Sequence, residues 1–519
     1  MAKEKANSKA TVLGIKAAKG SMIYTVGNII GSFAVLLLLI ILARLMNPTD
    51  FGIYAIAIAL YNLLAGHFVF GTVARKDIPQ MKDKKKIGSF ISNCYIVSLL
   101  IGAAVAIAAM LLSSFIATYF YHSAAMTGTL MAASALVFLY VLFNLTLAVL
   151  IALDKTKQGT VMYLLYSFIQ LLAATALVLE GYGVFGALVG LGIGLIIPSL
   201  IGICIIAKEV EYKFSGPSGE EIRHILGFST PVLVSNVAFF APPNIAILLL
   251  GVYETSLVVG NYNAAFRFGN FVSVILVSIS FVLLPSFSKA FSDKDLSLKI
   301  GNIYNSSVYY TLLLLLPIVV YVVSVAHPLL YLLFTNKYVM APFYFVVIAL
   351  GSVLGIISTY ASNLQVGYGD TKKFMYYQVL AVAIQIILLF ALTPLLGVEG
   401  VLLALFVISQ VIIGIIYVYA LYRQFHFKHR FGPLIRIIIP SILLLALLYY
   451  STALLHNSKW ALVTNLIVIL ALFPPLVVLF GAVGQREIKF LKDASKSMGM
   501  DFIAKYILDY AQFFIRDKK

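Results

Sequence analysis

The chain has 519 residues, of which 62% are apolar and 11% are charged, and its mean hydropathy is +1.01. Soluble globular proteins are typically about 45–50% apolar and 25% charged, so the composition predicts an all-α polytopic membrane protein. The formal net charge of +17 invites a nucleic-acid-binding interpretation, but the distribution of the charge argues against it, as shown below. Cys94 and Cys204 form neither a metal-binding spacing nor a disulfide framework, and we expect no metal and no cofactor.

Membrane-spanning helices need about 20 apolar residues to cross the hydrocarbon core. Both ends of the chain extend beyond the spans, as an arm over 1–20 and an amphipathic tail over 485–519 that is expected to lie on the inner membrane surface. In chain order, fourteen stretches have the required length and apolarity: 21–43, 51–72, 87–115, 129–153, 160–179, 183–207, 225–250, 257–285, 302–326, 340–366, 374–392, 398–422, 434–454 and 460–482.

The basic residues fix the expected orientation of these spans. Of the 37 Lys and Arg residues, only Arg44, Lys337 and Lys459 fall on the outer side, and only Arg267 falls in the middle of a span. All the others fall in the arm, in the inner loops, at the inner end of a span or in the tail. This bias follows the positive-inside rule and places both termini in the cytoplasm. An anionic inner leaflet therefore accounts for the high charge, and no nucleic-acid partner is expected.

Three short motifs recur in the same order along the chain. FGIYAIA (51–57) is echoed by VGNYNAA (259–265), DKTK (154–157) by GDTK (369–372), and YGVFG (182–186) by LGVEG (396–400). Because each repeat has six spans, an even number, both halves enter the membrane in the same direction. The axis that relates the two repeats therefore runs along the membrane normal. We expect an N-lobe over 21–215 (helices one to six), a C-lobe over 216–430 (helices seven to twelve) and an extra helix pair over 431–484.

Arg267 is the candidate site residue with the strongest physical argument. An arginine at bilayer depth costs about 2.5–3.5 kcal/mol, so it normally faces a protein interior or a wet cavity. Asn263, Arg267 and Asn270 recur at i, i+4 and i+7 and share one stripe of a helix, next to Tyr262. The stripe is suited to an anionic or hydroxyl-rich ligand, although it could instead only tie neighbouring helices together.

Four motifs carry a resemblance to the polysaccharide flippases of the multidrug, oligosaccharidyl-lipid and polysaccharide exporter superfamily. They are ARLMNPTDFGIY (43–54), FGTVAR (70–75), GNYNAAFR (260–267) and LQVGYGDTK (364–372), and the resemblance extends over about 15–430. Two departures stand out. Asn244 lies where the family often has Asp or Arg, and helices one and two carry no mid-membrane charge, which puts a strongly polyanionic cavity in doubt.

The resemblance implies that the chain moves a polyprenyl-phosphate-linked glycan from the cytoplasmic to the outer leaflet of the cell membrane. From the residues themselves, the two lobes are expected to enclose a cavity lined by amides, hydroxyls and aromatic faces, which suit sugars. Polar residues at this spacing could also simply pack the helix bundle. The cavity candidates on helices one, two and seven are Tyr24, Asn28, Tyr54, Asn62, Asn236 and Asn244.

Two other classes of function remain open. A drug or cation antiporter of the same superfamily usually has twelve spans and embedded acidic residues, and a membrane glycosyltransferase or polymerase needs catalytic groups in sizeable outer loops. The chain has neither pattern, and we predict a non-enzymatic transporter. We expect it to work as a monomer among membrane lipids, with other glycan-assembly proteins as partners.

Overall fold

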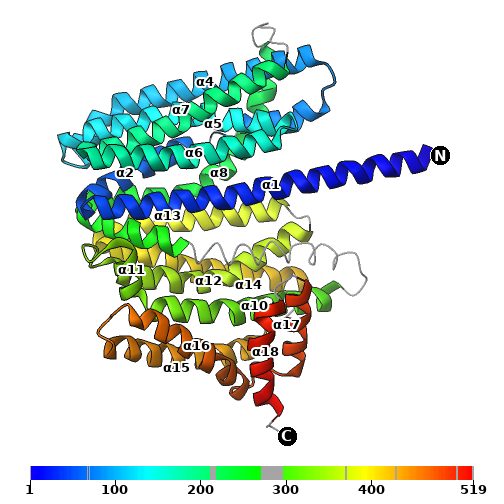
Figure 1. Ribbon diagram of the computed structural model, residues 1–519, viewed down its shortest axis with the longest axis vertical. Coiled ribbons are helices and arrows are strands. Elements are labelled where there is room, and N and C mark those ends of the chain that lie inside the picture. The colour runs from blue at the N-terminus through cyan, green and yellow to red at the C-terminus, as the bar shows by residue number, and fades with distance from the viewer. Residues whose placement is uncertain are drawn as a thin grey trace. The chain divides into compact units, whose positions relative to one another are not determined.

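The computed structural model describes the backbone of all residues except 1, 67, 69, 211–217, 271–295, 369–370, 427–428, 498–500 and 517–519. Every regular element in this described part is a helix, and none is a strand (Figure 1). This confirms the predicted all-α class. A chain in hydrocarbon has no water to satisfy its backbone, and a helix satisfies each N–H and C=O within one segment.

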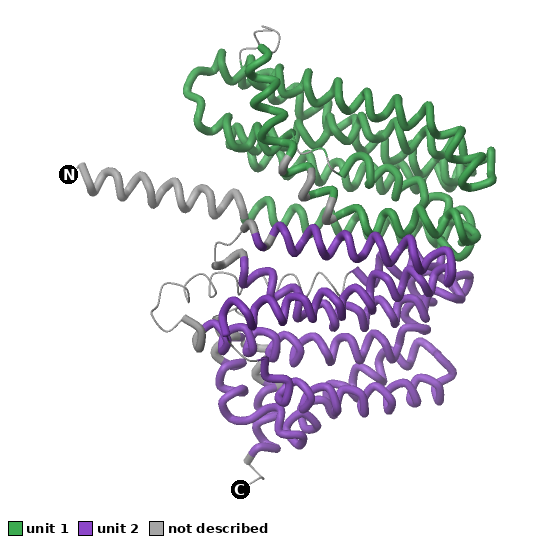
Figure 2. The backbone as a smooth tube through the Cα atoms, turned by 180° about the vertical axis from the view of Figure 1, so that it is seen from behind, with its two compact units in different colours: residues 1–260 green, residues 261–519 purple. Residues whose placement is uncertain are grey.

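The chain divides into two compact units, residues 1–260 and 261–519 (Figure 2). In unit 1, helices α4, α5, α6 and α7 lie side by side, α1 packs on α6, and α2 packs on α5 and α8. The elements of unit 1 are α1 (Ala2–Leu45), α2 (Pro48–Ala65), α3 (Phe70–Asp77), η1 (Ile78–Gln80), α4 (Lys84–Phe115), η2 (Ile116–Phe120), η3 (Ala124–Met126), α5 (Thr127–Ala152), α6 (Thr156–Leu177), η4 (Val178–Tyr182), α7 (Gly183–Glu209) and α8 (Gly219–Tyr253).

A helix over 256–270 follows α8 and crosses the division between the units. The core of unit 2 is built around α10, with side chains from α12, α14, α15 and α16 packed against it. The remaining elements are α10 (Leu296–Ser324), α11 (Ala326–Phe334), α12 (Ala341–Tyr368), α13 (Thr371–Leu402), η5 (Leu403–Ile408), α14 (Ser409–Phe425), α15 (Phe431–Leu454), α16 (Trp460–Leu479), α17 (Gln485–Ser497) and α18 (Asp501–Arg516).

Ten helical stretches in the described part are long and apolar enough to cross a membrane, so the chain is a multi-pass membrane protein. Two of them, Thr156–Glu209 and Met375–Phe425, have 54 and 51 residues. At 1.5 Å per residue each would be more than twice as long as the hydrocarbon core is thick, so each must turn back within itself. The predicted count of fourteen spans stays a prediction, because much of the stretch 257–285 lies outside the described residues.

The turns in these two long stretches fall on the predicted echo of YGVFG and LGVEG. Gly183 has φ 53° and ψ −133°, and Gly397 has φ 58° and ψ −129°. Only glycine adopts this backbone conformation without a steric penalty. The two motifs therefore build the same hairpin turn between consecutive helices, once in each unit.

The first echo motif makes a reciprocal contact within unit 1. A Cβ added to Gly52 would lie 1.8 Å from the carbonyl oxygen of Ser256, and one added to Gly260 would lie 2.0 Å from that of Pro48. Ser256 and Gly260 are the residues 208 positions after Pro48 and Gly52. The contact of Gly52 with Ser256 is therefore repeated, with the roles of the two repeats exchanged, by the contact of Gly260 with Pro48. Such a reciprocal pair of contacts is typical of two segments related by a two-fold axis. It supports the repeat inferred from the sequence.

The predicted span 51–72 is interrupted in the structure. Helix α2 ends at Ala65, where Gly66 donates its backbone N–H to the carbonyl of Asn62, and α3 begins only at Phe70. Glycine is among the weakest helix formers, which explains where the apolar run breaks. Apolarity alone therefore overestimated the length of this helix.

The lobe boundaries stay a prediction. They were placed by the sequence repeat at 215 and 216, whereas the compact units divide at Gly260, with α8 packed against α2, α3 and α4 of unit 1. The repeat describes which segments have similar sequences, and the compact units describe which segments pack together.

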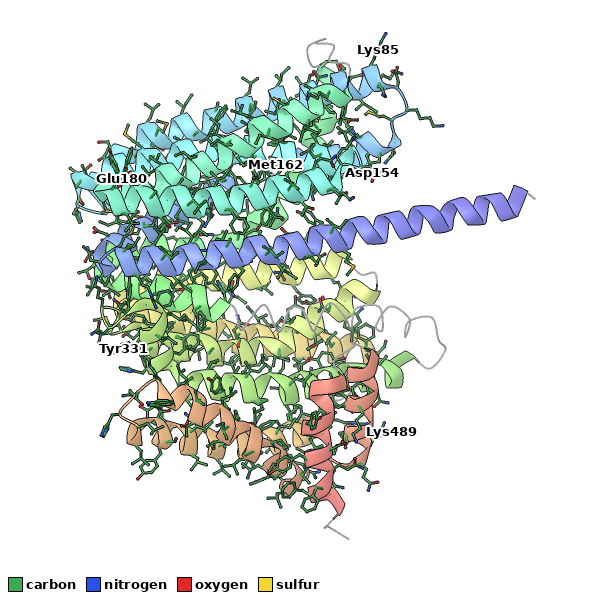
Figure 3. All side chains as sticks on the ribbon, in the orientation of Figure 1. Lys85, Asp154, Met162, Glu180, Tyr331 and Lys489 are labelled. Carbon is green, nitrogen blue, oxygen red and sulfur yellow. The ribbon has the colours of Figure 1, made fainter. Side chains whose placement is uncertain are left out.

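The loops alternate between the two ends of the helices, as the predicted topology requires. Figure 3 shows Lys85 and Asp154 at one end of unit 1 and Glu180 at the other. In unit 2, Tyr331 and Lys489 likewise lie at opposite ends. The assignment of these ends to the cytoplasmic and outer sides is a prediction that follows from the positive-inside rule.

The tail forms two helices. Helix α18 packs against α16 and α17, and Tyr510 donates a hydrogen bond of 3.1 Å to the carbonyl of Ala471 in α16. Ala511 is buried on this side, while Tyr506 and Phe513 are 68% and 61% exposed. An amphipathic helix with aromatic side chains outward fits the predicted position at the membrane surface.

The reciprocal glycine contact yields a matched pair of substitutions. We expect Gly52→Ala to lower the free energy of unfolding by about 1–3 kcal/mol, because its methyl group would overlap a backbone carbonyl. Gly128→Ala, at a position where nothing lies within 4 Å of the added Cβ, should leave stability unchanged or slightly higher. Thermal unfolding of both purified variants in the same detergent checks this. Equal unfolding midpoints would contradict the contact.

Candidate functional site

The predicted stripe around Arg267 is present in unit 2. The Nε of Arg267 donates a hydrogen bond of 3.4 Å to Oδ1 of Asn263, one helical turn earlier. Arg267 and Asn270 are half-buried, and Asn263 is 1% exposed. The structure therefore brings Arg267 and Asn263 together, with the guanidinium held along its own helix rather than extended into a loop.

Two polar groups beside Arg267 are buried without a hydrogen-bond partner among the described residues. They are Nδ2 of Asn263 and the hydroxyl of Tyr262, whose ring is fully buried and stacks on Phe266 at 5.7 Å. An unsatisfied buried polar group costs about 1–3 kcal/mol, and such groups call for an explanation. A hydroxyl-bearing ligand or a bridging water would satisfy both.

Asn261, at the start of the same motif, has a structural role that the sequence did not indicate. Its Oδ1 accepts hydrogen bonds from the backbone N–H groups of Met340 and Ala341, at 3.1 and 3.2 Å. These donors open α12, and the first turn of any helix has N–H groups without partners inside the helix. Asn261 therefore fixes the start of α12 against the helix that carries Arg267.

The predicted residues of helices one and two lie in unit 1. Tyr24 and Asn28 on α1 and Asn62 on α2 are half-buried, whereas Tyr54 on α2 is only 6% exposed and stacks on Phe51. Tyr54 therefore belongs to the packed interior of the unit. The half-buried positions of the other three are compatible with the cavity predicted for them, and their role there stays a prediction.

Tyr54 belongs to a set of tyrosines whose members on α5 and α6 were not predicted from the sequence. We call it the tyrosine cluster. Its rings meet edge to face between Tyr61 and Tyr140, at 5.8 Å, and tilted between Tyr163 and Tyr166, at 5.9 Å. The hydroxyl groups of Tyr54 and Tyr166 lie close enough to that of Tyr61 to interact with it electrostatically. The members of the cluster are Tyr54, Tyr61, Tyr140, Tyr163 and Tyr166 on α2, α5 and α6.

One amide accompanies the tyrosine cluster on α5. Asn144 donates a hydrogen bond of 3.4 Å from Nδ2 to the hydroxyl of Tyr140, one turn earlier. The signal in the sequence was the spacing of Tyr140 and Asn144 (i, i+4) and of Tyr163 and Tyr166 (i, i+3), which places each pair on one helical face. It could not be used without knowing which faces of α5 and α6 meet α2.

The two candidates on α8 differ in their surroundings. Asn236 is half-buried. Asn244 donates a hydrogen bond of 2.8 Å from Nδ2 to the carbonyl of Phe240 on its own helix. Pro242 and Pro243 lie between them and supply no backbone N–H to the helix. The side chain of Asn244 thus reinforces the turn that the prolines weaken, and a role in ligand binding stays a prediction.

The first turns of α8 are fastened to α3 and α4. Nδ2 of Asn93 donates to Oε2 of Glu221 at 2.7 Å, and Nε2 of His224 lies 2.7 Å from Oδ2 of Asp77. Lys76 lies over the ring of Phe228, 4.1 Å from its centroid. These contacts join residues more than 100 positions apart and hold the half of α8 that precedes the prolines.

The described residues contain no group of three or more His, Cys, Asp or Glu side chains that could hold a metal ion. In the same part of the chain, the candidate residues are one guanidinium and amides in unit 2, and amides and tyrosine rings in unit 1. Groups of these kinds suit the binding of a ligand, and they include no general acid–base pair for cleaving one.

Comparisons with known proteins agree with this chemistry. The sequence profile of a family described as "Polysaccharide biosynthesis protein" matches residues 41–342. No curated protein sequence matches the chain.

Solved structures show the same fold. A structure described as "Lipid II flippase MurJ, inward closed conformation" aligns with a TM-score of 0.72 and 17% identity, over 89% of this chain and 98% of that one. An inward-facing multidrug resistance MATE transporter of the MOP superfamily aligns with a TM-score of 0.64 and 17% identity, over 76% and 94%. A MOP superfamily transporter from Pyrococcus furiosus aligns at 0.52 and 17%, over 79% and 95%.

The hydroxyl of Tyr262 permits a direct test of the buried polar groups. Tyr262→Phe should keep or raise the unfolding midpoint of the purified protein, because it removes a buried hydroxyl that has no partner among the described residues. Tyr304→Phe is the matched control, since the Tyr304 hydroxyl donates to the carbonyl of Ile357 at 3.2 Å and its loss should lower the midpoint. A larger loss for Tyr262→Phe than for Tyr304→Phe would contradict the assignment.

Proposed function

Because the chain belongs to the polysaccharide biosynthesis protein family, we propose that it is a flippase for lipid-linked glycans. It would move a polyprenyl-phosphate-linked oligosaccharide or polysaccharide precursor from the cytoplasmic to the outer leaflet of the cell membrane. The observation that carries the proposal is the hydrogen-bonded pair of Arg267 and Asn263, which lies in the predicted span 257–285. An arginine at such a depth is costly, and by default it marks a functional site.

The phosphate groups of the substrate are the natural ligands of Arg267. Guanidinium and phosphate form charge-assisted, frequently bidentate hydrogen bonds, which are roughly twice as strong as neutral ones. Arg267 donates the N–H of its Nε to Asn263, and this hydrogen bond orients the guanidinium along its own helix. Asn263 is neutral, so this bond orients the charge without cancelling it.

The glycan would be bound by amides and aromatic faces. Each unit has such a set: the amides of Asn263 and Asn270 in unit 2, and in unit 1 Asn28 and Asn62 together with the half-buried members of the tyrosine cluster, Tyr140, Tyr163 and Tyr166. Sugars stack their apolar faces on tyrosine rings, and amides bond their hydroxyl groups. Both sets are uncharged, which suits a ligand whose charge is confined to its phosphates.

Movement between the two leaflets would use alternating access, in which the site opens to one side and then to the other. Helix α8 is suited to bend during this change. Its first turns are fastened to α3 and α4 through Asp77–His224 and Asn93–Glu221, while Pro242 and Pro243 interrupt its hydrogen-bond ladder further along. The His224–Asp77 pair is half exposed on its histidine side and therefore easily broken.

The rival functions receive less support from the site. A cation antiporter needs carboxylates embedded in its spans, and the candidate site among the described residues is cationic and neutral. A glycan polymerase or glycosyltransferase needs a catalytic constellation, and the candidate residues around Arg267 and on α1, α2 and α8 include no acidic or histidine side chain. The family match and the fold of transporters both favour transport without chemistry.

The proposal predicts a change in the sidedness of lipid-linked glycan in cells. Deleting the gene should trap the glycan on the inner face, and wild type should restore its outer exposure. Arg267→Ala should restore less than about a tenth of it, since one charge-assisted contact is worth at least about 1.4 kcal/mol. Arg267→Lys, which keeps the charge without the bidentate geometry, should restore an intermediate amount. Sidedness is measured with a membrane-impermeant glycan probe.

Lys337→Ala is the control for this experiment, because it removes one positive charge from an exposed loop away from the site. It should restore sidedness fully when expressed at the level of wild type. Rescue by Arg267→Ala equal to that of Lys337→Ala would reduce Arg267 to a packing residue. Unchanged sidedness on deletion would argue against the flippase function itself.

A further inference from the structure

Unit 2 contains a polar cavity formed by residues other than the candidate residues around Arg267. It has a volume of about 730 Å³ and lies where α10 and α15 begin and where α16 passes into α17. At the opposite ends of α10, α15 and α16, the side chain of Asn465 joins the three helices. Its Nδ2 donates to Oγ1 of Thr452 at 2.7 Å and to Oγ of Ser324 at 3.2 Å. The cavity is thus built on helices whose spacing is fixed from the far end.

The lining of this cavity is cationic. It contains the three arginines Arg430, Arg436 and Arg486, together with Asn302 and Ser306 as uncharged hydrogen-bonding groups. Among the described lining residues the one carboxylate is Glu487, whose Oε2 accepts the backbone N–H of Gly484 at 2.9 Å and caps α17. Three guanidinium groups against one engaged carboxylate give a net positive charge.

The walls are held by specific bonds. The backbone N–H of Arg430 donates to Oδ1 of Asn305 at 3.1 Å, which fixes the chain before α15 to α10. Nη1 of Arg436 donates to the carbonyl of Gly481 at 3.4 Å, and Tyr309 donates from its hydroxyl to the carbonyl of Ala482. The backbone at Arg430 and the guanidinium of Arg436 are therefore held by the fold, which lowers the entropic cost of binding an anion there.

Two helices begin at the cavity, which adds to its attraction for anions. The first turns of α15 and α17 both contribute lining residues, and a helix N-terminus carries a partial positive charge. Burial lowers the pKa of the neighbouring His429, so this ring is neutral near pH 7. The positive charge at the cavity therefore comes from the arginines and the helix ends.

The depth of the cavity indicates a membrane ligand. Arg430 immediately precedes α15, and Arg436 lies within its first two turns, about 7.5 Å from its start at 1.5 Å per residue. Beyond that level α15 exposes an apolar face, with Ile439 42% and Ile442 60% exposed. If α15 spans the bilayer as its length and apolarity indicate, the phosphates of lipid headgroups lie near its first turns and their acyl chains lie alongside such a face.

We propose that this cavity binds the phosphate headgroup of an anionic membrane lipid, with the acyl chains lying along α15. The three arginines hold the phosphate by charge-assisted hydrogen bonds, and Asn302 and Ser306 bond the remaining headgroup oxygens. The bound lipid would bridge α10, α15 and α17 and stabilise the packing of the last helix pair on unit 2. This binding does not depend on the flippase function.

The test measures lipid binding to the purified full-length chain by native mass spectrometry, with phosphatidylglycerol, phosphatidylcholine and inorganic phosphate as probes. Wild type should bind one phosphatidylglycerol at least about tenfold more tightly than phosphatidylcholine. The triple variant Arg430→Ala, Arg436→Ala, Arg486→Ala should lose this preference, because it removes the charge-assisted contacts to the anionic headgroup. The same three positions changed to Lys should keep part of it, because charge remains and the bidentate geometry is lost.

The matched control is the triple variant Lys84→Ala, Lys85→Ala, Lys86→Ala, which removes three positive charges from an exposed stretch at the start of α4. It should bind phosphatidylglycerol as wild type does. Equal loss in both triple variants would show a charge effect without a site and overturn the proposal. Competition by inorganic phosphate as strong as by the lipid would overturn the lipid assignment. If the triple alanine variant does not fold, Arg436→Ala alone must weaken the preference for phosphatidylglycerol.

Discussion

Hydrocarbon offers no partner for a polar group, and this constraint decides most of what the structure contains. Each backbone amide is satisfied inside a helix, so the described chain is helical and its turns fall at the ends of spans. The same constraint makes each polar side chain within a span informative. Arg267 bonded to Asn263 and the buried hydroxyl of Tyr262 are costly placements in such a solvent. The proposed function explains why they are retained.

The repeat gives the protein two similar frameworks and a site that differs between them. Gly183 and Gly397 build the same turn. At a close helix crossing, Gly52 packs on Ser256, and Gly260 packs in the equivalent way on Pro48. Arg267 has Ala59 as its counterpart one repeat earlier, so the cationic position is confined to the second repeat. A duplicated scaffold with an asymmetric charge suits a substrate that has one phosphate end and one sugar end.

Apolar length and glycine placement made the helices predictable, because both act within one segment. The all-α class and most helix ends followed from them, and the pair of Asn263 and Arg267 followed from helical spacing. The break between α2 and α3, the tyrosine cluster and the arginine cavity were not foreseen. Each depends on which faces of distant helices meet, as Tyr61 meets Tyr140 and Arg436 meets Gly481. Such pairings are set by tertiary packing and leave no local pattern.

The most direct test of transport uses the purified full-length chain in lipid vesicles. A lipid-linked oligosaccharide is placed in one leaflet, and its appearance in the other is followed with a glycan-cleaving enzyme that cannot cross the membrane. Vesicles that contain the protein should expose the glycan on the second side, while protein-free vesicles should retain the original asymmetry. Equally slow exposure in both preparations, with the protein folded and inserted, would contradict the proposed flippase function.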